Sequence, residues 1–155
     1  MTAIQVRQAT LADLDALGPM FDGYRQFYGQ SADLPAARHF VLERFNHAQS
    51  VWFIAHDGTD VAGFTQLYPS FSSVSMARIF ILNDLFVEQR HRQKGIGTML
   101  LDAAAQYAQT LGAIRLSLTT ARTNKTAQAV YEAAGWQRDE VFLTYHLQPA
   151  SRQGQ

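Results

Sequence analysis

The sequence contains no cysteine, which excludes disulfide bonds, thiolate metal sites and cysteine nucleophiles. No apolar run is long enough to span a bilayer, and the first residues lack the apolar core of a secretory leader, so we expect a cytoplasmic protein with no membrane partner. Neither sign of charge is in excess, because 13 Lys and Arg residues balance 13 Asp and Glu residues. This balance argues against a nucleic-acid partner bound through bulk charge. The five histidines have no metal-ligand spacing, so no metal is expected.

The composition is that of a globular protein. Apolar residues make up 47% of the 155 residues and charged residues 17%, a balance that permits a sizeable core. No internal repeat or linker is evident. The chain therefore predicts one domain over residues 1–148, followed by a loose polar tail over residues 149–155.

The first half of the chain predicts a strand, two helices and a strand hairpin. Ile4–Arg7 is a short strand, and Thr10 with Asp13 forms a capping box that opens a helix to about Phe27. A second helix begins at Pro35, a residue suited to a first helical turn. The strands Val51–His56 and Val61–Tyr68 flank an Asp-Gly turn signal, and a loop is expected from Pro69.

The second half of the chain predicts a strand–helix–strand unit, followed by a further helix and a last strand. Ala77–Val87 is a nearly continuous apolar run, typical of a strand covered on both faces. A glycine-containing loop then leads to a helix over Thr98–Leu111 and to a strand of alternating apolar and polar residues over 114–119. The next predicted helix is capped by Thr123 or Asn124 and buries Ala127, Val130 and Ala134. A last strand is predicted over Val141–Leu147. The predicted order is β-α-α-β-β-β-α-β-α-β, an α/β fold with a mixed sheet.

The loop before the third helix is the most informative segment. Gly95 and Gly97 lack a Cβ, so an anion can approach the unpaired main-chain N–H groups of a helix N-terminus, with Arg92 and Lys94 beside it. Glycines in such a turn can also serve only tight packing. A P-loop is excluded because no Ser or Thr follows Lys94 directly, and a dinucleotide fingerprint is excluded because Leu100 stands at the third glycine position.

Three blocks resemble the GNAT superfamily of acetyl-CoA-dependent N-acetyltransferases. Arg92–Gly97 is similar to the family's R/Q-x-x-G-x-G/A signature, and residues 83–87 are similar to the strand before it. The run from Thr123 through Tyr131 to Gly135-Trp136 looks like the family's N-x-x-A…Y…G(F/W) helix. The order of elements agrees from Ile4 to Leu147. The blocks look closest to the polyamine and histone-tail branch.

The resemblance implies acetyl-CoA as cosubstrate and assigns residues to it. In this family the strand ending at Val87 and the strand near Leu116–Thr119 are parallel and splay apart, and the pantetheine arm fills the gap like an added strand. A main-chain N–H near Leu85 or Phe86 would stabilise the thioester oxyanion. The expected coenzyme-binding residues are Leu85, Phe86, Val87, Arg92, Gln93, Lys94, Gly95, Ile96, Gly97, Thr98, Asn124 and Ala127. Asn124 could equally be a helix cap.

Tyr131 and Asp84 are the candidate catalytic residues. Tyr131 matches the position of the family tyrosine that protonates the departing thiolate or hydrogen-bonds its sulfur, although it could simply pack. The general base is less defined. Asn83 and Asp84 point to opposite faces of a regular strand, and Asp84 could be catalytic, could bind substrate or could be structural while a water chain removes the proton.

The acceptor amine is expected near the first two helices and the long strand. The candidate substrate residues are Tyr28, Tyr68 and Asn83, with Asp22, Asp33 and Glu43 as possible anions; Tyr24 is interpreted as core. Aromatic rings with a carboxylate suit a small cationic amine attacking directly in a ternary complex. The alternatives are a protein or peptide acceptor, a CoA-binding sensor without turnover, or an unrelated phosphate-binding scaffold. By the resemblance, a homodimer is expected.

Overall fold

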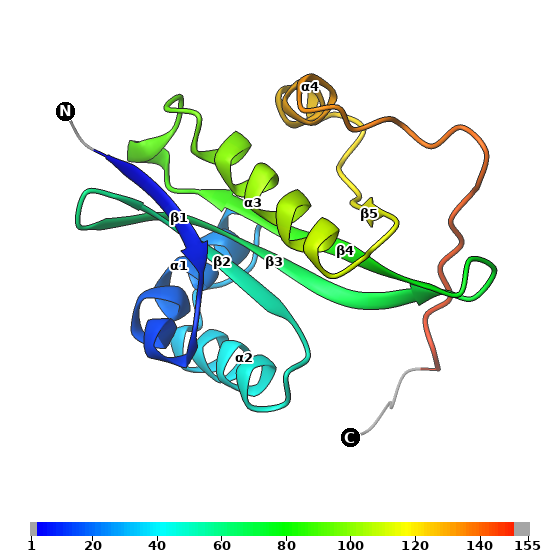
Figure 1. Cartoon of the computed structure of the whole chain (residues 1–155). Helices are drawn as coiled ribbons and strands as arrows, with labels where there is room; N and C mark the ends of the chain where they lie inside the picture. The colour runs from blue at the N-terminus through cyan, green and yellow to red at the C-terminus, as the bar shows by residue number, and fades with distance from the viewer. Residues whose placement is uncertain (1–2, 151–155) are drawn as a thin grey trace.

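The computed structural model describes residues 3–150, and these form a mixed sheet of five strands with helices on both faces (Figure 1). The strands lie side by side in sequence order: β1 (Ile4–Gln8), β2 (Val51–Asp57), β3 (Asp60–Ser72), β4 (Ala77–Val87) and β5 (Leu116–Ser117). The first four pair antiparallel, and β4 pairs parallel with β5. The α/β mixed sheet predicted from the sequence is confirmed.

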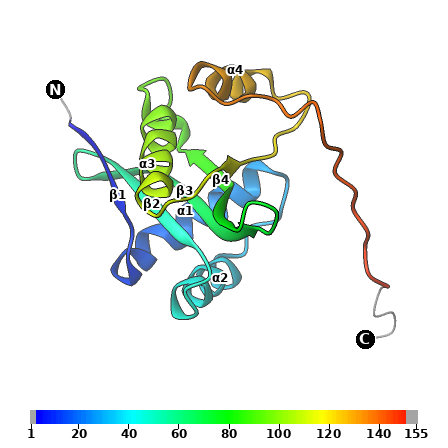
Figure 2. The same ribbon diagram turned by 45° about the vertical axis from the view of Figure 1, so that its right-hand side comes forward.

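The helices divide the core into two layers. Helices α1 (Leu14–Phe27) and α2 (Leu34–Asn46) cover one face of the sheet, and α3 (Ile96–Thr110) covers the other (Figures 1 and 2). Helix α4 (Lys125–Ala133) lies above α3, further from the sheet. Short 3-10 helices at Leu11–Asp13 and Gln89–His91 precede α1 and α3. No helix in residues 3–150 combines the length and apolarity needed to cross a membrane.

The helix starts follow their capping residues. The predicted capping box is confirmed, because the Thr10 N–H donates to the Asp13 carboxylate (2.8 Å) and the Thr10 hydroxyl accepts from the Ala12 N–H (3.3 Å). Helix α2 begins at Leu34, capped by Asp33. Helix α3 begins two residues before the predicted Thr98, because Gly95 adopts a left-handed φ of 79° and serves as the N-cap.

Strand β3 is longer than predicted. Its antiparallel ladder with β4 continues through Pro69↔Phe80 to Ser72↔Ala77, although the sequence predicted a loop from Pro69. Pro69 is tolerated because the pairing of β2 with β3 ends at Leu67. Beyond Leu67, one side of β3 has no strand partner among the described residues. The N–H that Pro69 lacks would face this side, so its absence breaks no hydrogen bond of the sheet.

Strands β4 and β5 separate soon after they meet. They pair only at Phe80↔Leu116 and Ile81↔Ser117, whereas β4 continues to Val87. The predicted splay is therefore present, and β5 is shorter than the strand predicted over residues 114–119. Within residues 3–150, the main chain of β4 from Leu82 to Val87 has no strand partner on this side.

Two predictions for the C-terminal region are wrong. Residues 141–147 form no strand, and their side chains are exposed. Helix α4 forms but fully buries none of its three predicted core residues: Ala127 and Val130 are half-buried, with Val130 packed against the α3 core, and Ala134 is exposed. Of the predicted loose tail, residues 149–150 are exposed, and residues 151–155 lie outside the described residues.

Candidate active site

Strands β4 and β5 separate beyond Ile81 and leave a gap in the sheet, and we call this gap the opening. The glycine loop follows β4 on one side of the opening, and α4 follows β5 on the other. The loop from Arg92 to Gly95 carries the chain from β4 to the first turn of α3, where main-chain N–H groups lack helical partners. A Cβ built at Gly97 would meet no atom within 4 Å, so the space beside this turn is open. The loop therefore has the exposed amides and the access that a diphosphate needs.

Both cationic side chains of the loop have partners within the protein. The Arg92 Nε donates to the Val87 carbonyl (2.9 Å), and its guanidinium lies over the Phe27 ring at 5.2 Å. The Lys94 Nζ donates to the Asp57 carboxylate (2.7 Å). The side chains of Arg92 and Lys94 thus hold the loop to β4 and to the end of β2.

Asp57 lies under the loop and contacts two of its residues. Besides Lys94, its Oδ2 lies 3.0 Å from the Nδ1 of His91. Asp57 and His91 are both buried, and His91 belongs to the 3-10 helix that leads into the loop. Sequence analysis missed this pair, because the two residues are 34 positions apart and Asp57 was noted only for its place in the Asp-Gly turn.

Replacing Asp57 with asparagine should destabilise the protein. The substitution removes the charge that holds His91 and Lys94, and a buried hydrogen bond to a charged group contributes about 2 kcal/mol. Urea unfolding of Asp57→Asn should show a loss of about this size in the free energy of unfolding. The matched control is Asp102→Asn, at an exposed position of α3. Equal stability of the two variants would contradict the anchoring role.

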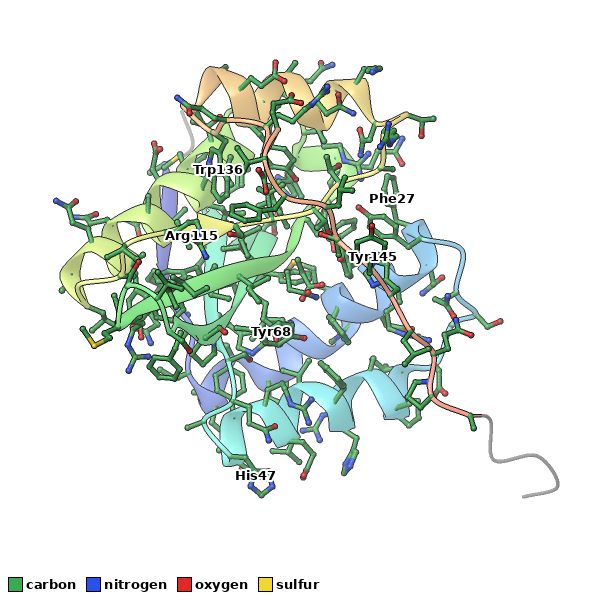
Figure 3. The ribbon with its side chains drawn as sticks, turned by 90° about the vertical axis from the view of Figure 1, so that its right-hand side faces the viewer. Phe27, His47, Tyr68, Arg115, Trp136 and Tyr145 are labelled. Carbon is green, nitrogen blue, oxygen red and sulfur yellow. The ribbon has the colours of Figure 1, made fainter. Side chains whose placement is uncertain are left out.

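A groove of about 300 Å³ runs between α3 and α4. It is lined by Thr98 from α3 and by Ala129, Val130, Ala133 and Ala134 from α4. Asn124 caps α4 by accepting from the Ala127 N–H (3.1 Å), which confirms the capping alternative for this residue. The Trp136 ring follows α4 and lies below it, 6.2 Å from the Tyr131 ring (Figure 3).

Asp84 is the buried acid of the opening. Its carboxylate accepts from Gln66 Nε2 and Asn83 Nδ2, and the Tyr24 hydroxyl also hydrogen-bonds to it. Burial raises the pKa of the Asp84 carboxyl, and the three hydrogen bonds lower it in part. Asp84 is therefore a carboxyl with an increased proton affinity. Its neighbours Asn83 and Tyr24 connect it to the opening.

A β-bulge at Asn83 decides which face Asp84 occupies. Gln66 pairs with Asp84 and Leu67 with Leu82, so Asn83 is an extra residue in β4. Before the bulge, Phe80 and Leu82 pack in the core under α3; after it, Leu85 and Val87 do so. Asp84 consequently lies on the face of α1. The expectation that Asn83 and Asp84 point to opposite faces is wrong, because the Asn83 amide donates to the Asp84 carboxylate (3.1 Å).

Two tyrosines, Tyr24 and Tyr68, lie beside Asp84. The Tyr24 ring lies 5.1 Å from the ring of Tyr28, the C-cap residue of α1, and Tyr131 from α4 lies near Tyr28. Burial, followed by Tyr28, raises the pKa of the Tyr131 phenol, so its hydroxyl holds its proton at neutral pH. Burial, followed by Asp84, raises the pKa of Tyr68. The structure thus brings together the candidate residues Tyr28, Tyr68, Asn83, Asp84 and Tyr131.

Tyr24 and Gln66 belong to this site, although the sequence did not assign them to it. Tyr24 was interpreted as core because of its helical spacing, and Gln66 stands in an apolar strand. A polar residue at a buried position of β3 was the available signal for Gln66. The possible acceptor anions have other partners: Asp22 binds Arg25 (2.7 Å), Asp33 caps α2, and Glu43 lies 3.1 Å from His47.

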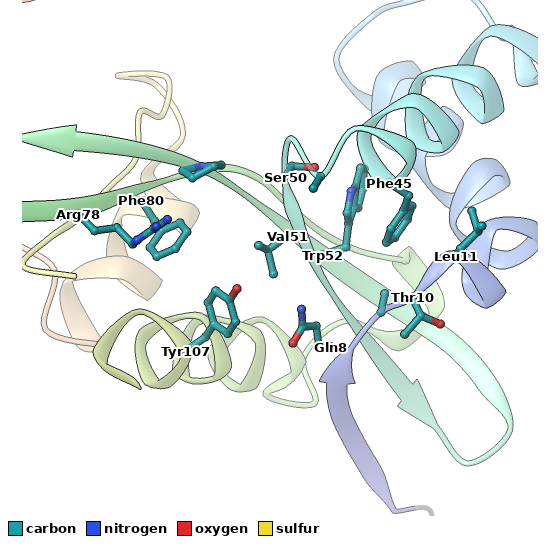
Figure 4. Close-up of a pocket in the computed structure, with 13 residues that line it drawn as sticks. Gln8, Thr10, Leu11, Phe45, Ser50, Val51, Trp52, Arg78, Phe80 and Tyr107 are labelled. Carbon is teal, nitrogen blue, oxygen red and sulfur yellow. The ribbon is translucent and has the colours of Figure 1, made fainter. Parts of the chain in front are cut away.

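The larger cavity of the molecule lies elsewhere. Its volume is about 550 Å³, and it opens at the far end of the sheet, between β1, β2 and the α3 residue Tyr107 (Figure 4). None of the candidate site residues lines it. Because it lacks a titratable acid and the glycine loop, we place the site at the gap between β4 and β5 instead.

Comparison with known proteins identifies the family. Residues 17–136 match the model of the Acetyltransferase (GNAT) family. The chain belongs to the GNAT family. The uncharacterized N-acetyltransferase YhfO of Bacillus subtilis is 46% identical over 144 residues, which cover 93% of this chain and 97% of YhfO. L-ornithine N5-acetyltransferase NATA1 of Arabidopsis thaliana is 35% identical over 87 residues, 56% of this chain and 37% of NATA1.

A solved structure supports the same assignment. The crystal structure of a probable acetyltransferase superposes with a TM-score of 0.90 at 38% identity, covering 95% of this chain and 99% of that chain. This GNAT protein is an acetyl-CoA-dependent N-acetyltransferase.

Proposed function

We propose that this enzyme transfers the acetyl group of acetyl-CoA to a small primary amine, by direct attack in a ternary complex. The observation that carries the proposal is the buried carboxyl of Asp84, which lies beside Tyr24 and Tyr68 in the stretch of β4 that β5 leaves unpaired. A carboxylate among aromatic rings attracts a small cation through ion-pair and cation–π interactions. A polyamine-type acceptor fits this chemistry.

The residues present fit the coenzyme. The unpaired stretch of β4 from Leu82 to Val87 can pair with the amides of a pantetheine arm, and the apolar groove between α3 and α4 continues from it. The open turn at Gly97 can hold the diphosphate, with Gln93, Ile96 and Thr98 as neighbouring main-chain contacts. Asn124 and Ala127 at the start of α4 lie across this groove.

Three groups of this chain carry the proton and charge changes. Acetyl-CoA supplies the acetyl group as a thioester. Asp84, when ionised, accepts the proton that the cationic amine must lose before it can attack. A main-chain N–H of Leu85 or Phe86 stabilises the negative charge on the carbonyl oxygen. Tyr131 donates a hydrogen bond to the departing sulfur.

The acceptor class is supported by one relative and by the shape of the site. NATA1 is named for acetylation of L-ornithine, a small amino acid with a side-chain amine. Tyr28, Tyr68 and Asn83 are the residues proposed to contact the acceptor. We extend the proposal to three expectations from the sequence. The enzyme belongs to the polyamine-type branch, it is located in the cytoplasm, and residues 1–148 form its acetyltransferase domain.

The test is an acceptor screen. The purified protein would be mixed with acetyl-CoA and polyamines, diamino acids, aminoglycosides or a lysine peptide, and free thiol would be measured. We expect thiol release with diamines and diamino acids. Turnover of the peptide alone would favour a protein acceptor, and coenzyme binding without thiol release from any acceptor would favour a sensor.

Replacing Gly97 with leucine should abolish coenzyme binding and leave the fold intact. The side chain would enter open space rather than another part of the protein, and this is the space proposed for the diphosphate. Calorimetric titration with CoA should detect no heat, while the thermal unfolding curve should shift little. Ala105→Leu, on the exposed side of the same helix, is the size-matched control and should bind CoA normally. Unchanged affinity of Gly97→Leu would remove the loop from the site.

A further inference from the structure

Arg44 in the last turn of α2 is a half-buried cation without an anionic partner. Its Nε is buried and has no hydrogen-bond partner within residues 3–150, and no carboxylate of these residues forms an ion pair with it. The guanidinium lies over the Phe40 ring, 4.2 Å from its centroid. A guanidinium keeps its charge and binds carboxylates through paired hydrogen bonds. Arg44 can therefore bind a carboxylate that the described part of the chain does not supply.

Gln66 presents an unpaired acceptor beside Asp84. The Gln66 side chain is fully buried, and its Nε2 donates to the Asp84 carboxylate. Its Oε1 is buried and has no hydrogen-bond partner in the part of the chain that the structure describes. A buried acceptor left unpaired is costly, and an ammonium group carries three donors. An amine placed here can donate to this oxygen and to the carboxylate together.

Arg44 and Asp84 lie toward two ends of one row across the sheet. Trp52, Gln66 and Asp84 are direct neighbours on β2, β3 and β4. Phe45, the residue after Arg44, stacks on Trp52 with the ring centroids 6.2 Å apart, so the end of α2 lies over the β2 end of the row. Neighbouring strands are about 4.8 Å apart, so the row spans roughly 10 Å.

Tyr68 lies within reach of both charges. It follows Gln66 by two residues on β3 and shares its face, which is the face toward α1 and α2 (Figure 3). Burial raises the pKa of the Tyr68 phenol most, the charge of Asp84 raises it further, and the charge of Arg44 lowers it. Tyr68 is only half-buried, so the surface between the two charges is accessible to a ligand.

We propose that the acceptor carries a carboxylate as well as an amine, with Arg44 binding the carboxylate while Asp84 and Gln66 hold the amine that is acetylated. This inference rests on the proposed function and narrows its acceptor class from small amines to diamino acids. Because the row of roughly 10 Å separates the two charges, the acetylated amine is the side-chain amine and not the α-amine beside the carboxylate. A simple diamine leaves Arg44 unpaired.

Matched acceptors test the inference without changing the protein. Lysine and cadaverine differ only in the carboxylate, as do ornithine and putrescine, and lysinamide replaces the carboxylate of lysine with a neutral amide. A hydrogen-bonded charge pair is worth about 10-fold or more in affinity. The kcat/KM of each diamino acid should therefore exceed that of its diamine, and lysine should exceed lysinamide, by about this factor. Mass spectrometry of the product should place the acetyl group on the side-chain amine.

The failures of the two proposals are distinguishable. Equal kcat/KM within these pairs, or acetylation of the α-amine, would overturn the inference and leave acetylation of a small amine standing. Absence of thiol release with every one of these amines would contradict the proposed function itself, and the inference with it.

Replacing Arg44 with glutamine tests the residue. The ratio of kcat/KM for lysine over cadaverine should fall by about 10-fold or more, whereas a merely structural role would lower both values alike. Arg44→Lys keeps a charge and should recover part of the ratio. Arg38→Gln, at an exposed arginine of the same helix that pairs with Asp15 (3.0 Å), is the matched control and should keep the wild-type ratio. An unchanged ratio in Arg44→Gln would exclude Arg44 as the carboxylate partner.

Discussion

Replacing Tyr131 with phenylalanine should lower kcat by at least about 100-fold, the lower range of the effect of a positioned acid. The variant loses only the hydroxyl, so CoA affinity measured by calorimetry should be nearly unchanged. The half-buried ring contacts Trp136 and should keep this packing as phenylalanine. The result would separate a role in chemistry from a role in binding.

The raised pKa of Tyr131 limits how it can act. A phenol whose pKa lies above its ordinary value of about 10 is a weaker acid than a thiol of pKa about 8.5. It therefore stabilises the departing thiolate by donating a hydrogen bond, because full transfer of its proton to a thiolate of lower proton affinity is unfavourable. Tyr107→Phe, a second half-buried tyrosine on α3 away from the site, is the control and should keep full activity. Normal turnover by Tyr131→Phe would exclude Tyr131 as the acid.

Replacing Asp84 with asparagine should lower kcat/KM for the acceptor by about 100-fold or more. Asparagine keeps the shape of the side chain but can neither accept the proton of the amine nor attract its charge. CoA binding should be retained, because Asp84 lies on the α1 face of β4, not at the glycine loop. Asp102→Asn, at an exposed position of α3, is the matched control.

The pH dependence of activity and of stability tests in which direction the pKa of Asp84 is shifted. Asp84 must be ionised to act as a base, and burial raises its pKa, so activity should fall as the pH drops through a value above the ordinary aspartate range. The folded state also holds this proton more tightly than the unfolded state. Stability should thus decrease as the pH rises from the ordinary pKa to the raised one, and Asp84→Asn should be at least as stable as wild type at neutral pH. An unstable Asp84→Asn variant would contradict this sign.

Local signals predicted most of the helices and strands. The capping box at Thr10, the glycine before α3 and the alternation in the strands act within a few residues, so the sequence reveals them. The end of β3 was missed because pairing with β4 overrides the preference of Pro69 for a loop. The last strand, predicted over Val141–Leu147, is wrong, because these residues have the composition of a strand but pair with no strand among residues 3–150.

Sequence motifs predicted most residues of the candidate site one by one. The residues that the sequence did not assign to it are those that reach the site only through tertiary contacts. Tyr24 has the spacing of a core residue, and only the fold places its hydroxyl on Asp84. Asp57 and His91 meet across 34 positions of sequence. Neither contact leaves a pattern in a single sequence.

The bulge at Asn83 has a consequence for how this enzyme can vary. Because side chains alternate along a strand, the extra residue sets the two halves of β4 out of phase. Deleting Asn83 would restore regular alternation, with Leu82 and Leu85 still toward α3 and the acid still toward α1. What the bulge adds is a second polar side chain on the face of the acid, because two consecutive residues of a regular strand cannot share a face. A one-residue deletion at this point should therefore remove the amide beside Asp84 and leave the acid in place.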